Sequence, residues 1–279
     1  MNRLARREIM GAVMFGLTGL CTLVTISSLF FVLGYLVWHG IGSINLDFFT
    51  QLPKPPGEVG GGMANAIAGS AEIIFLATLI GLPVGLLAGV YLSEYGGQKF
   101  SFVVRYATDL LNGVPSIVVG IFAYALVVVS LGHFSILAGA VALSVIFIPI
   151  AVTTTEQFLR DVPDSFREAA LALGAPKWKA IATTVVPAAF SALATGMLLA
   201  VARIAGETAP LLFTSFSNQF WNLSPNQPAA SLPVMIFTYA ISPYRDWHRQ
   251  AWAAGLVLLA LVLFINVSAR LLLPRRVFR

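Results

Sequence analysis

Two charged side chains follow a strongly apolar part of the sequence. Residues 180–202 contain no Asp, Glu, Lys or Arg, and Arg203 and Glu207 come directly after them. At the usual helical rise, Arg203 lies about 24 Å along the helix from Pro187, which is between the midplane and the outer side of a bilayer. An ionised side chain there costs at least ~2.5–3.5 kcal/mol, so it faces a protein interior or a pathway.

The spacing of four residues puts Arg203 and Glu207 on one helix face, where each charge reduces the cost of the other. Two interpretations stay open. The pair fixes helix packing, or the guanidinium offers a fork of donors that matches the oxygens of an oxyanion. In the second case Thr208 and Thr214 could add hydroxyl donors. Glu207 would then hold Arg203 until an anion competes for it, and binding would be weak and brief, as a pathway requires.

A second stretch, residues 156–186, is too long for a simple connection and contains signals for the start and the end of a helix. Ser165 and Glu168 have the spacing of a capping box, in which each side chain bonds a free backbone N–H at the start of a helix. Residues 168–173 are therefore expected to form a short helix. Gly174 is expected to end it in the C′ position, where a left-handed backbone favours glycine.

The apolar side chains of this stretch leave two interpretations. An ordinary connection between two membrane helices would explain the helix signals but not the apolar side chains. Leu171, Leu173 and Trp178, however, are costly to leave in water, which favours a surface that a partner protein covers.

Membrane helices must position these residues. Hydrophobic residues make up 58% of the 279 residues and charged residues only 10%, against about 25% charged in a soluble domain. Cys21 is the only cysteine, which excludes an internal disulfide and a cysteine metal cluster. The sequence has no nucleophile elbow, no metal-binding pair of histidines and no GxxxxGK[ST] loop. The composition thus predicts an all-α integral membrane protein that is not an enzyme and does not bind ATP through that loop.

Uncharged stretches of about 20 residues predict six membrane-spanning helices. They lie at 9–37, 73–93, 180–202 and 250–269, with two more in 110–155 on either side of a break at 131–134. The first is about twice the length of the apolar core of a secretory signal peptide, so we interpret it as a retained helix. The second carries Gly81, Gly85 and Gly89 on one face, which predicts close packing against a neighbouring helix.

The basic residues indicate the orientation. Of the 17 Lys and Arg residues, 13 flank the predicted helices on one side and three lie on the other. By the positive-inside rule, both termini are expected in the cytoplasm. Arg105 and Asp109, at the inner end of the third span, have the spacing of an ordinary surface pair. Residues 217–231 are expected to form an outer loop, either a connector or a docking surface.

The segment 168–174, EAALALG, followed by Val186 and Pro187, resembles the EAA loop of ABC importer permeases. Thr184 and Val186 replace the Ile and Leu of that pattern, and Pro187 is kept. The resemblance implies a type I ABC importer permease, in which the short helix docks into a cleft of a separate ATP-binding subunit. The residues that it assigns to this coupling contact are Arg167, Glu168, Ala169, Ala170, Leu173 and Gly174.

Residues 202–214, ARIAGETAPLLFT, resemble the fifth helix of the phosphate-importing branch of this family. Shorter pieces agree at 60–66, 115–120 and 217–221, so the resemblance covers most of the chain after residue 60. It implies transport of inorganic phosphate across the bacterial inner membrane. From the chemistry of their side chains, the residues that we expect in the substrate pathway are Arg203, Glu207 and Thr208. Relatives commonly carry an Arg where this chain has Thr153, so any role of that Arg is absent or moved.

The resemblance also implies partners and a division of the chain. The partners are a second, homologous permease subunit, two ATP-binding subunits that hold ATP and Mg, and an extracytoplasmic phosphate-binding protein. Residues 1–63 would form an N-terminal helix and first outer loop, 64–272 the permease core with its coupling loop at 160–187, and 273–279 a basic cytoplasmic tail.

Several alternatives stay open. The nearest is a permease for another oxyanion, such as sulfate or molybdate. A stand-alone channel or secondary transporter would predict an inverted repeat with helices broken at the midplane, which the sequence does not suggest. A membrane enzyme would need a convergent acid–base or metal site, which is also missing from the pattern of residues.

Overall fold

A computed structural model describes residues 3–272 of the chain. These residues are almost entirely helical and form no β-strand, although an isolated bridge joins Pro53 and Gly61. This confirms the predicted all-α class. The helices are α1 (Arg3–Gly40), α2 (Leu46–Thr50), α3 (Ala64–Glu94), α4 (Gln98–Gly113), α5 (Ser116–Ala123), α6 (Val129–Leu131), α7 (Ile136–Arg160), α8 (Asp164–Ala172), α9 (Lys177–Ala180), α10 (Val186–Ala205), α11 (Ala209–Leu212), α12 (Leu232–Ala240) and α13 (Arg245–Leu272). A π-helical turn at Tyr124–Val128 joins α5 to α6, and another at Ile181–Val185 joins α9 to α10.

Five continuous segments are long and apolar enough to cross a membrane, so the chain is a multi-pass membrane protein. They are Arg7–Ser43, Ala64–Glu94, Ile136–Arg160, Lys177–Ala205 and Arg245–Ser268. The third predicted span differs from a straight helix, because Lys99–Gly113 and Ser116–Leu131 meet at 102°. Val114 has the extended backbone that a following proline favours, which breaks the helix there. The predicted count of six is reached if this bent pair forms one span.

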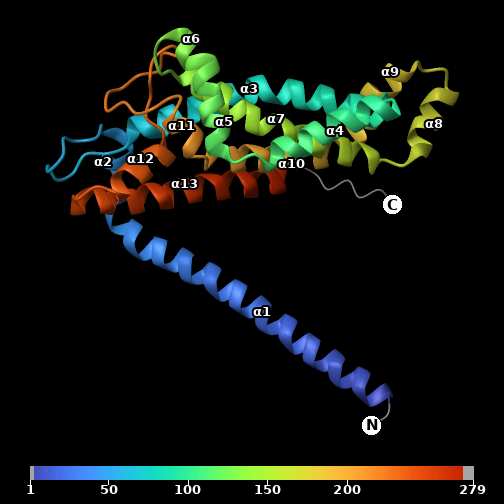
Figure 1. Cartoon of the computed structure of the whole chain (residues 1–279), viewed down its shortest axis with the longest axis horizontal. Helices are drawn as coiled ribbons and strands as arrows, with labels where there is room; N and C mark the ends of the chain where they lie inside the picture. Colours follow the sequence, from blue (N-terminus) through green and yellow to red (C-terminus); the bar gives the residue numbers. More distant parts are fainter. Residues whose placement is uncertain (1–2, 273–279) are drawn as a thin grey trace.

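Helix α1 lies apart from the rest of the molecule and meets it only near its C-terminal end (Figure 1). The apolar part of this helix is not buried by the chain at all. At the junction, Gly40 approaches the carbonyl oxygen of Trp252 so closely that a Cβ would lie 2.8 Å from it. The rings of Tyr35 and Trp252 also meet at 5.3 Å. The long apolar surface of α1 is therefore open to lipid or to another protein.

Helices α3 and α7 form the most extensively packed pair in the core (Figure 1). Three glycines spaced by four residues allow it. A Cβ on Gly85 would lie 2.4 Å from the Cβ of Ala151, and one on Gly89 would lie 2.4 Å from the Cβ of Thr155. Gly81 faces the ring of Phe147 in the same way. The predicted packing role of these glycines is confirmed, and the two helices cannot slide past each other without a clash.

The segment 213–231 folds over one end of the core. Its backbone carbonyls at Gln227 and Pro225 accept the N–H groups of Ile136 and Leu137, which are free donors at the start of α7. The side chain of Ser135 accepts a third N–H as the N-cap. Helix α12, which we did not expect from the sequence, follows this segment and is largely buried. The segment is thus bound to the start of α7 and buried at both ends, while residues 219–221 and 223–227 are exposed.

Candidate functional site

The loop between α7 and α9, residues 161–176, carries α8 and is called the α8 loop. The predicted capping box is wrong. Helix α8 begins at Asp164, after Pro163, with no side-chain cap, so Ser165 lies inside the first turn instead of before it. Pro163 sets the helix start one residue before Ser165, because its fixed φ suits the position that precedes a helix.

The predicted end of α8 is confirmed. Gly174 has φ +80°, and its N–H donates to the Leu171 carbonyl while the N–H of Ala175 donates to the Ala170 carbonyl. These two bonds form a Schellman motif, which satisfies carbonyls that a helix end leaves free. A Cβ on Gly174 would meet no atom within 4 Å. The glycine is therefore required for its backbone conformation and not for space.

One face of the α8 loop is exposed and apolar. Leu173 is 89% exposed and Trp178, just beyond the loop, is 66% exposed. Leu171, Glu168 and Ala169 are also exposed, and Ala170 is half-buried. Of the residues assigned to coupling by resemblance, this surface presents Glu168, Ala169, Leu173 and Gly174 outward.

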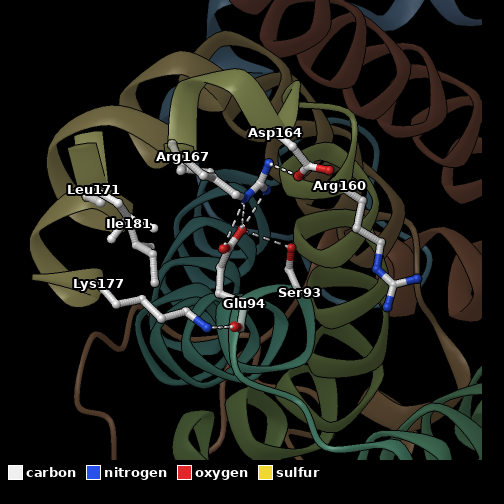
Figure 2. A pocket seen from close by; sticks show the side chains of 10 residues that line it. Ser93, Glu94, Arg160, Asp164, Arg167, Leu171, Lys177 and Ile181 are labelled. Atoms are coloured by element: carbon white, nitrogen blue, oxygen red, sulfur yellow. Dashed lines mark hydrogen bonds and ion pairs between the residues drawn. The ribbon is translucent and has the colours of Figure 1, made fainter. Parts of the chain in front are cut away.

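Arg167 has a different environment, because its side chain turns into the protein (Figure 2). Its Nη2 donates to Glu94 Oε1 at 2.7 Å and to the Leu159 carbonyl at 2.7 Å. Its Nη1 donates to the Val162 carbonyl at 2.6 Å and to Asp164 at 3.3 Å. One guanidinium therefore joins the end of α7, the start of α8 and the end of α3.

Glu94, the last residue of α3, accepts most of this interaction. Arg167 Nε lies 3.1 Å and 3.2 Å from the two carboxylate oxygens of Glu94. The side chain of Glu94 is only 4% exposed. These hydrogen bonds with Glu94 raise the pKa of Arg167 above its ordinary value. Glu94 is not among the site residues expected from the sequence. A signal existed, because an acidic residue at the C-terminal end of a helix is unfavourable unless a cation compensates for it.

A cavity of about 510 Å³ borders this ion pair and is lined by residues of α3, α7, α8 and α9. Lys177, at the start of α9, reaches across it to donate to the backbone carbonyl of Glu94 (Figure 2). The Lys177 ammonium also lies 4.6 Å from the centroid of the Tyr95 ring. The end of α3 is thus bound by Arg167 of α8 and by Lys177 of α9.

A second ion-pair cluster corrects an expectation about α4. Arg105 does not pair with Asp109, its neighbour one turn away, but with Glu156 of α7 at 2.7 Å. Arg160 binds the same carboxylate oxygen at 2.9 Å. Glu156 is largely buried and attracts both cations, because an unpaired carboxylate there would be costly.

The structure separates Arg203 from Glu207. Helix α10 ends at Ala205, so the two residues do not share a helix face, and no ion pair joins them in residues 3–272. Arg203 is exposed, while Glu207 and Thr208 are half-buried in the break before α11. The premise of an i,i+4 pair on one helix is therefore wrong. The assignment of these three residues to a pathway stays a prediction.

The same break positions neighbouring groups. Thr214 is buried and donates its hydroxyl proton to the Pro210 carbonyl at 2.7 Å, so it is not available as a donor to a ligand. Gly120 of α5 packs on Pro210, where a Cβ would lie 2.7 Å from its Cα. The segments 115–120 and 202–214, which both resemble the family, thus meet in space.

Among the described residues, no group of three or more His, Cys, Asp or Glu side chains could hold a metal ion.

Comparison with known proteins gives one matching family and several similar chains. The profile of the family described as binding-protein-dependent transport system inner membrane component matches residues 81–277. The chain is 47% identical over 260 residues to the phosphate transport system permease protein PstA of Yersinia pestis, covering 90% of this chain and 88% of that protein. It is 49% identical over 242 residues to the PstA protein of Xylella fastidiosa strain Temecula1, covering 86% and 84%.

Solved structures agree on the fold. A bacterial alginate ABC transporter, solved with an alginate-bound periplasmic protein, contains a chain that matches with a TM-score of 0.66 and 14% identity. The match covers 97% of this chain and 98% of that one. A chain of the inward-facing MetNI methionine ABC transporter matches with a TM-score of 0.60 and 21% identity, over 78% and 95%. With the type I ABC importer permease fold and the family profile in agreement, the chain belongs to the family of binding-protein-dependent transport system inner membrane components.

Proposed function

We propose that the chain is a permease subunit of an ATP-driven ABC importer that moves inorganic phosphate across the bacterial plasma membrane. One observation carries the proposal: identity of 47–49% to phosphate transport permeases over 86–90% of the chain. Five continuous apolar helices and a bent pair supply the membrane part. In this function the chain is not an enzyme.

The proposal assigns ATP hydrolysis to other subunits. The sequence has no GxxxxGK[ST] loop, so ATP and Mg would be held by a dimer of ATP-binding subunits. A second, PstC-type permease would complete the transmembrane part, and an extracytoplasmic phosphate-binding protein would deliver the substrate. The bare apolar surface of α1 leaves space for such a partner within the membrane.

The outward face of the α8 loop, with Glu168, Ala169, Leu173 and Gly174, would be the contact to the ATP-binding subunit. The exposed apolar side chains of Leu173 and Trp178 support this assignment, because water is an unfavourable environment for them. The excess of Lys and Arg on the same side of the helices supports a cytoplasmic position for this loop and for both termini.

Arg203, Glu207 and Thr208 would lie along the substrate pathway. Arg203 is exposed in this chain and no carboxylate neutralises it within the described residues, which leaves its fork of donors available to an oxyanion. Glu207 nearby would weaken the binding of an anion, as release into the cell requires.

The test is uptake by the complete complex in proteoliposomes. We expect radiolabelled phosphate to accumulate only with ATP and the binding protein, and unlabelled phosphate to compete better than sulfate or molybdate. Stronger competition by sulfate or molybdate would favour the alternative of another oxyanion. Uptake without ATP would contradict the importer and favour a channel or secondary transporter.

A further inference from the structure

We infer that Glu94 is a positioning residue that joins α8 to the membrane helix α3, so that a displacement of α8 reaches the transmembrane core through the Glu94–Arg167 contact. The inference rests on the proposed function, because it assumes that a partner subunit moves α8. Neither the family profile nor the resemblance of the EAA segment assigns Glu94 a role.

The contact bridges elements that the chain itself connects only at a distance. Arg167 and Glu94 are 73 residues apart. Along the chain, α8 is directly attached to α7 and to α9, but not to α3. The carboxylate of Glu94 therefore gives α8 a direct polar contact with a helix to which the chain does not attach it.

The geometry of Arg167 makes this contact stiff. Its guanidinium donates to Glu94 on one side and to the carbonyls of Leu159 and Val162 on the other. A guanidinium is planar, and its five N–H donors are fixed relative to one another. When α8 turns, either Glu94 follows Arg167 or several charge-assisted hydrogen bonds break. The second outcome is the more costly one, because the side chain of Glu94 is buried.

Helix α3 would pass the displacement on, because it is locked to α7. Gly89 meets Thr155 and Gly85 meets Ala151 with no space for an added methyl group. Glu94 lies on the same helix, one and a half turns beyond Gly89. A displacement of Glu94 would therefore move the packed pair of α3 and α7 together, and not only the end of α3.

The chain offers a matched control on the same guanidinium. Asp164 also accepts a bond from Arg167, at 3.3 Å, but its side chain is 87% exposed and it belongs to α8 itself. Loss of that carboxylate leaves the link between α8 and α3 intact. Comparing Glu94→Gln with Asp164→Asn therefore separates the bridging contact from a general loss of one charge near Arg167.

The experiment measures phosphate moved per ATP hydrolysed by purified complexes in proteoliposomes, for the unaltered protein, Glu94→Gln, Asp164→Asn and the double variant Glu94→Gln/Arg167→Gln. We expect this ratio to fall at least about fivefold in both variants that lack Glu94, the lower end of typical couplings between sites. Asp164→Asn should keep the ratio. The double variant is included because it also removes the guanidinium that Glu94→Gln leaves without its buried carboxylate partner.

The outcomes distinguish the inference from the function on which it rests. If the unaltered complex moves no phosphate, the proposed function fails. If it moves phosphate and an assembled Glu94 variant keeps the normal ratio, the inference is overturned. Failure of both Glu94 variants to assemble would also overturn it, because the pair would then serve the fold alone. An equal fall in Asp164→Asn would overturn it as well, since that residue does not bridge to α3.

Discussion

Two arginines of this chain, Arg167 in α8 and Arg203 near the end of α10, have opposite surroundings. Arg167 has a side chain that is only 19% exposed, and it bonds two carboxylates and two backbone carbonyls. Arg203 is exposed, although it lies in an apolar helix, and forms no ion pair with any described residue. The comparison teaches that a partnered arginine serves this chain's own architecture. Arg203, which is exposed and has no ion pair among the described residues, does not serve the architecture in this way.

The largest effect on stability is expected at the partnered arginine. Arg167→Ala leaves the Glu94 carboxylate buried without a cation, a loss of about 3–5 kcal/mol in similar buried pairs. We expect a much lower thermal midpoint and yield of the purified complex. Arg167→Lys keeps the charge but not the fork of donors, so its thermal midpoint should fall between those of the unaltered protein and Arg167→Ala. If Arg167→Ala had a normal midpoint, the buried contacts of Arg167 would contribute nothing to architecture and the contrast with Arg203 would fail.

The opposite result is expected at Arg203. Arg203→Gln should assemble normally, because no partner in this chain loses a bond. Phosphate uptake should fall at least about tenfold, since a hydrogen bond to a charged group contributes about 1.5–3 kcal/mol. Both readouts are to be measured on the same preparations.

Glu207→Gln and the double variant Arg203→Gln/Glu207→Gln are the controls for this result. A pathway arginine predicts that the double variant assembles but does not transport phosphate. Loss of assembly in each single variant, with recovery of assembly and uptake in the double variant, would instead identify a structural pair that forms within the complete complex.

Gly174 tests the outward face of the α8 loop with a smaller cost to the fold. A residue with a Cβ in the left-handed conformation costs about 1–2 kcal/mol, and the open space around Gly174 adds no clash. We expect Gly174→Asp to remain in the membrane but to lose ATP-driven uptake, because the carboxylate would press against the partner. Gly174→Asn tolerates the same backbone and should retain more activity. A normal uptake rate in Gly174→Asp would refute the docking surface.

The smallest effect is expected at Asp164. Its ion pair with Arg167 is mostly exposed to solvent, and such pairs contribute about 0–1 kcal/mol. Asp164→Asn should therefore leave the thermal midpoint of the complex almost unchanged, with a slight dependence on salt concentration. A loss as large as that of Arg167→Ala would show that burial does not separate the two carboxylates around Arg167.

Structural features that depend on neighbours along the chain could be predicted from the sequence. Gly174 could be placed in a C′ position because a helix end depends on a few adjacent residues. The start of α8 was misplaced because two local signals compete there, and the backbone of Pro163 prevails over the hydroxyl of Ser165. The break at Pro115 was missed because an uninterrupted apolar run conceals a helix boundary.

The membrane class, the approximate spans, the glycine face of α3 and the family resemblance follow from the sequence alone, because hydropathy and small-residue spacing act locally. Which charges meet depends on the tertiary structure. Glu94 binds Arg167, which is 73 residues away in the sequence. Arg105 binds Glu156, 51 residues away, and not Asp109, which is only four residues away. The physical reason is burial: a buried carboxylate gains more from a cation than an exposed one does, and packing alone determines which carboxylates are buried.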